Sequence, residues 1–473
     1  MHVLALDQGT SATKALVVST ARGVVAEVEV AVHPRALADG GAEQDAEELW
    51  SSILEAGRAA LARAGVRADV VALANQGETV LAWDRGSGRP LAPALSWQDR
   101  RAGECCARLA AHADRLAAIT GLPLDPYFAA PKMAWLREHV TRAGVVTTSD
   151  AWLVHRLTGA YVTDAATASR TLLLDLDRGA WSAEACAAFA IDPASLPRIV
   201  GCAETIGTTM AFGDAVPVAG LAVDQQAALF GEGCLAPGEA KCTYGTGAFL
   251  LVNVGAHPRR SRAGLASCVA WRLGTATTYC LDGQVYTAGA ALGWLREVGL
   301  LDSVESLGVG ARRAANGVLF VPALAGLGAP FWRPAARGAF VGLSLATGRD
   351  DLVRAVVDGI AAQVAWVARA AADDLGDGLE RLRVDGGLSR SPTLMQAQAD
   401  LAQVPVEVYP SAHATALGVA ALARLALGDA ASAADATGGW TAAAVYEPRI
   451  GADEAGACLA RWRRAADAVM ALA

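Results

Sequence analysis

Lysine is almost absent from this chain of 473 residues. Of its 40 basic residues, only Lys14, Lys132 and Lys241 are lysines, and all the others are arginines. The 48 acidic residues outnumber the basic ones and give a net charge of −8. The chain therefore offers no broad basic field, and nucleic acid is not an expected partner.

Long uncharged apolar runs are also missing, so a membrane-spanning helix is not expected. The most Ala-rich segment, residues 414–431, is interrupted by Arg424 and Asp429. The first residues do not resemble a secretory signal, because Asp7 interrupts the apolar run and no basic region precedes it. We therefore expect a cytoplasmic protein that does not associate with a membrane, and its oligomeric state, including a homo-oligomer, stays open.

Several common site signatures are lacking as well. The nine cysteines include no CxxC pair and no catalytic signature, so we expect reduced, mostly buried thiols. No GxxxxGK[ST] motif occurs, which excludes the Walker phosphate loop. No GxGxxG follows a strand-like segment, so a dinucleotide-binding fold has no support.

The overall composition indicates a large, well-packed globular protein. Hydrophobic residues make up 53% and charged residues 19% of the chain, and this length favours two domains. The opening "MHVLALDQGTSATKALVVST" is a strand-like run that ends at Asp7, turns through small residues and becomes apolar again. A third strand, a helix over residues 46–64 and a fourth strand follow, and this order predicts a mixed sheet.

The same strand–turn–strand pattern returns half a chain later. Residues 238–255, "GEAKCTYGTGAFLLVNVG", again place a Gly-Thr-Gly turn between two apolar strands. This weak internal repeat indicates two related domains, with the Gly- and Pro-containing segment 231–240 as their boundary. We predict domains over 1–234 and 235–473, the last 45 or so residues forming a helical extension. A third glycine turn, "RVDGGLSRSP", lies between a strand and a helix.

Glycine turns of this kind can wrap a phosphate, because the backbone approaches closely and Thr or Ser adds a hydrogen bond. Two such hairpins, one from each domain, could hold a polyphosphate from both sides. An acid at the tip of the first hairpin could then hold Mg²⁺, a cation that prefers carboxylate, water and phosphate oxygens. Asp7 suits that position, either directly or through water.

Six segments together resemble the FGGY family of carbohydrate kinases, and the glycerol kinase branch is the most similar. The segments occur in the family's order between about residue 1 and residue 425. They are "LALDQGTSATKALVV", "ALANQGETVLAWDRGSGRPLAPALSWQDRR", "GLAVDQQAALFG", "CTYGTGAFLLVN", "GLGAPFWRPAARGAFVGL" and "RVDGGLSRSPTLMQAQAD". The resemblance implies an α/β fold of two ribonuclease-H-like domains, as in the actin and sugar-kinase superfamily, with a cleft between them. It also implies ATP and Mg²⁺ as cofactors and a small polyol or sugar as the molecule that is phosphorylated.

The resemblance also implies roles for particular residues. Asp224 in "VDQQ" corresponds to the general base, and a carboxylate there could accept the proton of the attacking hydroxyl. The polyol would be held by residues that correspond to Glu78, Trp97, Tyr127, Asp224, Gln225 and Phe249. The phosphates and the nucleoside would be held by residues that correspond to Gly9, Thr10, Ser11, Lys14, Thr246, Gly247, Gly289, Gly386, Gly387 and Ser391.

This chain departs from the glycerol kinase pattern at one position that would contact the substrate. Glycerol kinases have "NQRET" where this chain has "NQGET", so Gly77 replaces an arginine. The loss removes up to five hydrogen-bond donors and leaves space. Two milder departures are Lys14, where Arg is frequent, and Ser391, where Asn is frequent.

Two alternatives to a small-polyol kinase follow from these features. The nearer one is a kinase of a ketose or of a longer alditol, because Gly77 leaves more room in the pocket. The remote one is an actin- or chaperone-like ATPase, in which the nucleotide drives a conformational switch. The polyol set that includes Glu78, Trp97 and Gln225 speaks against a switch ATPase, since such a protein needs no substrate pocket beside the γ-phosphate.

Overall fold

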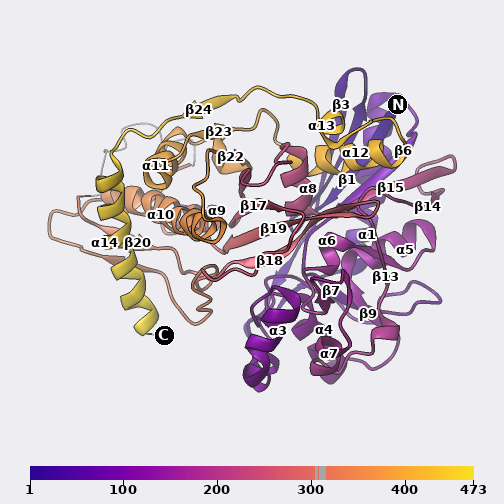
Figure 1. Ribbon diagram of the computed structural model, residues 1–473, viewed down its shortest axis with the longest axis horizontal. Coiled ribbons are helices and arrows are strands. Elements are labelled where there is room, and N and C mark those ends of the chain that lie inside the picture. Colours follow the sequence, from indigo (N-terminus) through magenta and orange to yellow (C-terminus); the bar gives the residue numbers. More distant parts are fainter. Residues whose placement is uncertain (304–306, 308–315, 473) are drawn as a thin grey trace.

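Two mixed β-sheets form the centre of the molecule, one in each half of the chain (Figure 1). The computed structural model describes residues 1–303, 307 and 316–472. The N-terminal sheet has the order β14-β15-β6-β1-β2-β3. Its strands are β1 (His2–Gln8), β2 (Ala12–Ser19), β3 (Gly23–Ala31), β6 (Val70–Asn75), β14 (Thr205–Thr209) and β15 (Val216–Val223).

The C-terminal sheet has the order β18-β19-β17-β16-β22-β23-β24. Its strands are β16 (Ala240–Tyr244), β17 (Ala248–Gly255), β18 (Ala266–Leu273), β19 (Ala276–Val285), β22 (Leu382–Asp385), β23 (Val406–Val408) and β24 (Ala444–Tyr446). The two sheets share one pattern at their centres. β1 pairs antiparallel with β2 and parallel with β6, and β16 pairs antiparallel with β17 and parallel with β22. The internal repeat and the mixed sheet predicted from sequence are thus confirmed.

Helices cover both faces of the N-terminal sheet. Alternate residues of β1 face opposite ways, so that Leu4 and Leu6 pack in the core that contains α1 (Ala46–Ala64). Val3 and Ala5 pack on the other side, in the core that contains α12 (Ala414–Ala426). The predicted ends of α1 are confirmed. Asp45 accepts a hydrogen bond from the Glu47 N–H at 2.9 Å, and Gly65 ends the helix in the left-handed region with φ +64°.

The position of α12 shows how the two halves interlock. This helix comes late in the chain, yet it packs on β1, β6 and β15 of the N-terminal sheet and against α8 (Asp224–Gly231) (Figure 1). Gly418 allows a close approach, because a Cβ atom there would lie 1.9 Å from the Ala227 carbonyl oxygen. The predicted division between residues 234 and 235 stays a prediction.

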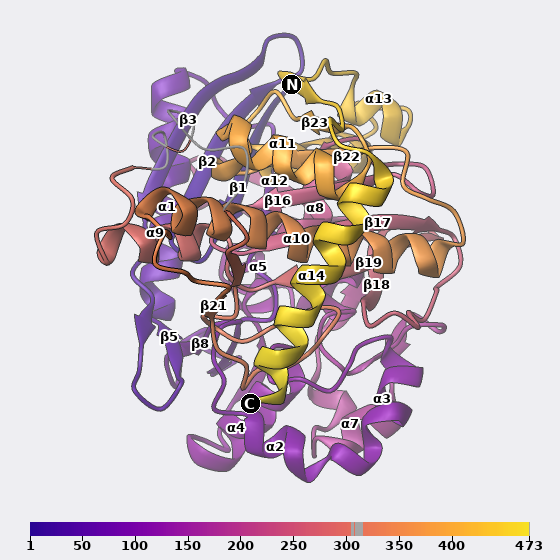
Figure 2. The same ribbon diagram turned by 90° about the vertical axis from the view of Figure 1, so that its left-hand side faces the viewer.

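Two helices, α10 (Arg349–Leu375) and α11 (Pro392–Ala402), pack on the C-terminal sheet. A third, α14 (Ala452–Ala471), packs on these two from the outside (Figure 2). α10 is the one helix of the described chain that is long and apolar enough to cross a membrane, but 78% of its most apolar stretch is buried. This burial is typical of a core helix.

The last segment was expected to be helical, but β24 interrupts it and pairs antiparallel with β23, because the sheet edge supplies the hydrogen bonds that a short apolar run cannot make alone.

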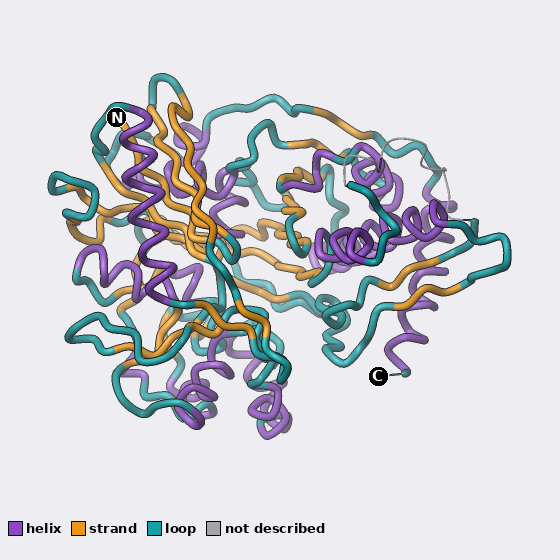
Figure 3. The backbone as a smooth tube through the Cα atoms, turned by 180° about the vertical axis from the view of Figure 1, so that it is seen from behind, coloured by secondary structure: helices purple, strands orange, loops and turns teal. Residues whose placement is uncertain are grey.

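The remaining elements surround these layers, most of them in the N-terminal half (Figure 3). A smaller sheet has the order β4-β5-β8-β7-β9, and three strand pairs stand apart, β10–β13, β11–β12 and β20–β21. The strands are β4 (Arg35–Ala36), β5 (Ala42–Gln44), β7 (Val80–Trp83), β8 (Ala94–Leu95), β9 (Val145–Thr148), β10 (Val162–Asp164), β11 (Leu174–Asp175), β12 (Ala180–Trp181), β13 (Arg198–Val200), β20 (Leu319–Val321) and β21 (Ala339–Val341). The helices are α2 (Gly103–Arg108), α3 (Ala113–Thr120), α4 (Ala129–His139), α5 (Ser149–Thr158), α6 (Ala165–Ala168), α7 (Ala183–Ala188), α9 (Gly289–Glu297) and α13 (Ala433–Thr437), with short 3₁₀ turns at Ala110–His112, Pro193–Ser195 and Gly387–Arg390.

Candidate active site

A cavity of about 280 Å³ lies where the two hairpin turns face each other. Residues from both halves of the chain line it. The residues predicted from sequence that line it are Asp7, Gly9, Thr10, Ser11, Lys14, Gly77, Glu78, Trp97, Tyr127, Asp224, Gln225, Thr246, Gly247 and Phe249. The cavity therefore brings together the predicted base, metal ligand, polyol set and both phosphate turns.

The first turn is a tight hairpin between β1 and β2, held in register by the pairing of Asp7 with Lys14. The Gly9 N–H donates to the Ala12 carbonyl at 3.0 Å and closes the turn. The Thr10 hydroxyl accepts a hydrogen bond from the indole N–H of Trp97 at 2.9 Å. Trp97 thus links the phosphate turn directly to the predicted polyol set.

The second turn joins β16 to β17 and is equally tight. The Gly245 N–H donates to the Gly247 carbonyl at 2.9 Å, and the Gly289 N–H donates to the Gly245 carbonyl at 3.0 Å. A Cβ atom on Gly247 would lie 2.5 Å from the Val285 carbonyl oxygen, so only glycine fits there. One on Gly245 would meet no atom closer than 4.0 Å. The two glycines of the turn therefore have different steric requirements.

Asp224 lies at the junction of β15 and α8, between the phosphate turns and the polyol set. Its Oδ1 accepts a hydrogen bond from the Gln225 N–H at 2.7 Å. Burial, with the charges of Asp7 and Glu78, raises the pKa of Asp224 to about 7, although Lys241 and the Gln225 N–H act in the opposite direction. A carboxyl with a pKa near neutrality is well matched to accept and release a proton.

Asp7 lies at the end of β1 and lines the cavity. Burial raises its pKa to about 6, Lys14 lowers the pKa, and the nearby Asp385 and Glu29 raise it. Among the described residues, no three His, Cys, Asp or Glu side chains form a ready-made metal cluster. A single carboxylate such as Asp7 fits Mg²⁺, because this ion is commonly held by one or two carboxylates together with substrate phosphates.

The polyol side of the cavity combines aromatic faces with a buried carboxylate. The rings of Trp97 and Phe249 meet edge to face at 5.9 Å, and those of Trp97 and Tyr127 at 6.0 Å. Glu78 is 4% exposed, and its Oε1 accepts a hydrogen bond from Nε of Arg170 at 2.5 Å. Burial raises the pKa of Glu78, while Arg170 lowers it. Polar and C–H surfaces are therefore both available to a polyhydroxy compound.

Gly77 contributes no side chain to this wall of the cavity. A Cβ atom on it would lie 3.0 Å from Cγ2 of Val223, so the two residues pack tightly. Position 77 therefore supplies no side-chain hydrogen-bond donor to the cavity, and the Val223 methyl group lies close to the glycine. The roomier pocket expected from this substitution stays a prediction.

The structure also places residues at the cavity that sequence reasoning did not single out. They are Arg170, Val223, Gln226, Thr243, Gly245, Asp282 and Thr415. Lys241 lies beside the cavity, and its ammonium donates to Oε1 of Gln225 at 2.5 Å and to the Thr243 hydroxyl at 2.7 Å. Only the rarity of lysine pointed to Lys241, and no local pattern marks Arg170 or Asp282.

Four of the residues predicted to hold the nucleotide lie outside the lining of this cavity: Gly289, Gly386, Gly387 and Ser391. Gly289 supports the second turn through its N–H. Gly386, at φ +86°, lies against Tyr244, where a Cβ atom would be 2.4 Å from the carbonyl oxygen. Ser391 caps α11 by accepting a hydrogen bond from the Leu394 N–H. Their contact with a nucleoside stays a prediction.

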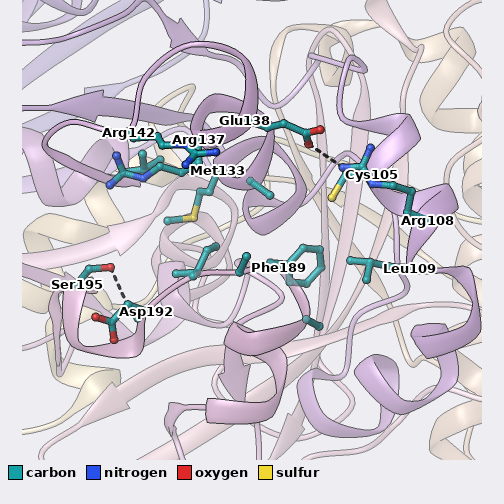
Figure 4. A pocket seen from close by; sticks show the side chains of 15 residues that line it. Cys105, Arg108, Leu109, Met133, Arg137, Glu138, Arg142, Phe189, Asp192 and Ser195 are labelled. Carbon is teal, nitrogen blue, oxygen red and sulfur yellow. Dashed lines mark hydrogen bonds and ion pairs between the residues drawn. The ribbon is translucent and has the colours of Figure 1, made fainter.

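A second and larger cavity, of about 560 Å³, lies among α2, α4 and the segment that follows α7 (Figure 4). Met133, Phe189 and Leu109 form apolar walls, and an ion pair of 2.8 Å joins Arg108 to Glu138 at its edge. None of the residues predicted from sequence lines it. We assign the active site to the smaller cavity, because that cavity holds the phosphate turns and a carboxylate with a perturbed pKa.

Comparison with known proteins agrees with this assignment. Residues 2–231 match the N-terminal domain of the FGGY family of carbohydrate kinases, and residues 240–427 match its C-terminal domain. The chain is 42% identical to a glycerol kinase from Myxococcus xanthus, over 98% of this chain and 99% of that one. It is 43% identical to a glycerol kinase from Thermus brockianus, over 98% of both chains.

Solved structures show the same architecture. A crystal structure of Plasmodium falciparum glycerol kinase with ADP superposes with a TM-score of 0.90 at 29% identity, over 99% of this chain and 98% of that one. A ligand-bound xylulose kinase from Lactobacillus acidophilus superposes with a TM-score of 0.88 at 22% identity, over 99% and 98% of the two chains. The two-domain fold predicted from sequence is confirmed.

Proposed function

The chain belongs to the FGGY family of carbohydrate kinases and phosphorylates a polyol or sugar with ATP, and we propose that Asp224 is the general base of this reaction. The observation that carries the proposal is the position of Asp224 between the phosphate turns and the polyol set. Its raised pKa suits proton transfer near neutral pH. General-base assistance is typically worth about 10²–10⁴-fold in rate.

The two turns hold the phosphates from opposite sides. Thr10 and Ser11 offer hydroxyls from the first turn, and Thr246 and Gly247 offer a hydroxyl and backbone N–H from the second. Lys14 adds a positive charge at the same edge. Asp7 is the residue that would hold Mg²⁺, which neutralises charge on the transferring phosphoryl group when it is bound. These groups position the γ-phosphate in line with a hydroxyl beside Asp224.

The substrate that this site supports best is a small polyol of the glycerol type. Glu78 and Gln225 are placed to hydrogen-bond hydroxyls, while Trp97, Tyr127 and Phe249 provide faces for C–H groups. The relatives named above carry the name glycerol kinase. The substrate proposed for this chain therefore belongs to the class that the names of these relatives give.

A longer alditol or a ketose is the second candidate, and one observation favours it. Gly77 stands where an arginine would otherwise bind hydroxyls, so glycerol loses a contact that a longer molecule could replace elsewhere in the cavity. A switch ATPase has no comparable support, because a substrate pocket completed by Glu78 and the aromatic rings would serve no purpose in one.

The experiment that tests the function is a substrate panel. ADP release and product mass are measured for the purified protein with ATP, Mg²⁺ and glycerol, tetritols, pentitols or ketoses. We expect phosphorylation of at least one polyol and far less ATP hydrolysis without an acceptor. ATP hydrolysis that is equally fast with no acceptor would instead indicate the switch ATPase.

We also propose that the protein works in a reducing compartment, as expected for a cytoplasmic enzyme. All nine cysteines are free thiols and seven of them are buried. Burial raises the pKa of Cys202, Cys234 and Cys242, which keeps these thiols protonated and unreactive.

A further inference from the structure

We propose that Lys241 is a positioning residue, which holds the side chain of Gln225 so that its amide N–H₂ group faces the substrate. This role rests on the proposed function, because it makes Gln225 a hydrogen-bond donor of the polyol set. Lys241 is fully buried on β16 and does not line the cavity, whereas Gln225 does. The contact between them joins the two halves of the chain, since Gln225 lies at the start of α8.

The contacts of the Lys241 ammonium determine the orientation of the Gln225 amide. Nζ donates to Oε1 of Gln225 at 2.5 Å and to the Thr243 hydroxyl at 2.7 Å. An ammonium has donors and no acceptor, so it can hold an amide only through the amide oxygen. The opposite orientation would set the amide N–H₂ against the ammonium, with two donors facing each other. The chemistry of Lys241 therefore fixes which end of the amide lies toward it.

The free end of the Gln225 amide is its N–H₂ group. The backbone N–H of Gln225 donates to Oδ1 of Asp224 at 2.7 Å, which ties the residue to the predicted base. No protein group in the described part of the chain accepts a hydrogen bond from Nε2 of Gln225. Because the oxygen is turned toward Lys241, behind the cavity wall, the N–H₂ group is the end of the amide that is left for a ligand.

A fixed donor at this position complements the acids of the cavity. Asp224 and Glu78 line the same cavity, and an ionised carboxylate only accepts hydrogen bonds. A substrate hydroxyl that accepts from the Gln225 N–H₂ keeps its own proton for one of these carboxylates. Without the ammonium, the amide is free to rotate and to present a further acceptor instead. Lys241 should therefore increase the affinity for the polyol, and it should do so through Gln225.

The rarity of lysine in this chain agrees with such a role. Arginine fills almost every basic position, and only Lys14, Lys132 and Lys241 are lysines. A guanidinium spreads its donors over a broad planar fork, whereas an ammonium concentrates three donors on one atom. The acceptors of Gln225 and Thr243 are both served by the single Nζ atom, an arrangement that favours lysine.

The decisive variant is Lys241→Met, which keeps a long unbranched side chain but removes the ammonium. KM and kcat are measured with the polyol that is phosphorylated fastest, at about pH 9, because Lys241 also lowers the pKa of Asp224 and this carboxyl is ionised well above its pKa of about 7. One hydrogen bond corresponds to a factor of about two to ten in affinity. We expect KM for the polyol to rise by about threefold to tenfold, and kcat to change by less.

A double-mutant cycle tests whether Lys241 acts through Gln225. Gln225→Ala removes the amide and should raise KM for the polyol by at least as much as Lys241→Met does. When Lys241→Met is added to Gln225→Ala, KM should change by less than twofold, because the group that Lys241 positions is gone. A residue with a merely structural role would show its full effect in both backgrounds.

The matched control is Lys132→Met. Lys132 is also fully buried, but its ammonium donates to the backbone carbonyls of Pro126 and Phe128 at 2.9 and 2.8 Å, and to that of Tyr127. None of these acceptors belongs to Gln225, so the effect of Lys132→Met on KM should be the same with and without the Gln225 side chain.

A second variant covers the case that Lys241→Met does not fold, as judged by thermal unfolding. Thr243→Val removes the other acceptor of the ammonium and leaves Lys241 in place. We expect a smaller rise of KM in the wild-type background and none in the Gln225→Ala background.

The outcomes separate the role of Lys241 from the proposed function. An unchanged KM in the folded variants, or an effect of Lys241→Met that adds in full to that of Gln225→Ala, would overturn the positioning role and leave the kinase assignment intact. A wild-type protein that phosphorylates no polyol or sugar would overturn the proposed function, and the role of Lys241 with it.

Discussion

The two hairpin turns have the same topology but different chemistry. The first follows β1, whose next-to-last residue is Asp7, and the second follows β16, which ends on the buried Tyr244. Both central strands pair antiparallel with the next strand and parallel with a later one. The N-terminal hairpin therefore adds an ionisable group to the phosphate cradle, whereas the C-terminal hairpin contributes backbone and a hydroxyl.

This difference extends to the rest of the cavity. The predicted base Asp224 and the polyol carboxylate Glu78 come from the N-terminal half. The C-terminal half supplies groups that support them: Lys241 donates to Gln225, and Asp282 pairs with Arg170. The two halves share a sheet topology but contribute different side chains to the same cavity.

The largest effect is expected at the base. Asp224→Asn removes the proton acceptor but keeps the shape of the side chain, so kcat should fall by about 10²–10⁴-fold. Nucleotide binding should persist, because the turns that hold the phosphates are untouched. Steady-state rates and ATP titration check both points, and near-normal turnover in this variant would contradict the role of Asp224.

The next effect is expected at the acid of the first hairpin. Asp7→Asn removes the carboxylate that the second turn lacks, and the Mg²⁺ concentration at half-maximal rate should rise by about 10–100-fold. Mg²⁺ titration of the rate at saturating ATP measures this shift. Lys14→Met serves as the comparison, since it should weaken ATP binding with a smaller change in Mg²⁺ dependence.

A smaller effect is expected from steric change in the second hairpin. Gly247→Ala places a Cβ atom 2.5 Å from the Val285 carbonyl oxygen, so the turn must shift, at a cost of about 1–3 kcal/mol. We expect KM for ATP to rise by about tenfold or more. Gly245→Ala is the matched control, because its Cβ atom meets nothing closer than 4.0 Å. Equal effects of the two substitutions would argue against a close approach of the backbone at Gly247.

The last prediction concerns the dependence of the rate on pH. Asp224 accepts a proton only when it is ionised, and its pKa is raised to about 7. kcat/KM should therefore rise with pH below about 7, by up to tenfold per unit, and level off above it. A rate profile between pH 5 and 9 tests this. Lys241→Met should move the acidic limb to higher pH, because Lys241 lowers the pKa of Asp224; an unmoved limb would mean that another group controls it.

Much of the fold and of the site was predictable because the signals are local. The capping residues Asp45 and Gly65 lie directly beside the ends of α1. Each hairpin is predicted by a glycine turn between two apolar runs. The resemblance to FGGY kinases then predicted that Asp224 and the polyol set lie at the same site as the two turns. Fourteen lining residues of the cavity could be named in this way.

The sequence by itself determined the two sheets, the two turns and the acids at the strand ends, because periodicity, glycine and caps act over short stretches of chain. Only the tertiary structure decided that α12 packs on the N-terminal sheet, that β24 completes the C-terminal one, and that Arg170 meets both Glu78 and Asp282. The last pairing joins residues far apart in the chain. No local pattern encodes such a contact, since it exists only when the two halves of the chain meet at the cleft.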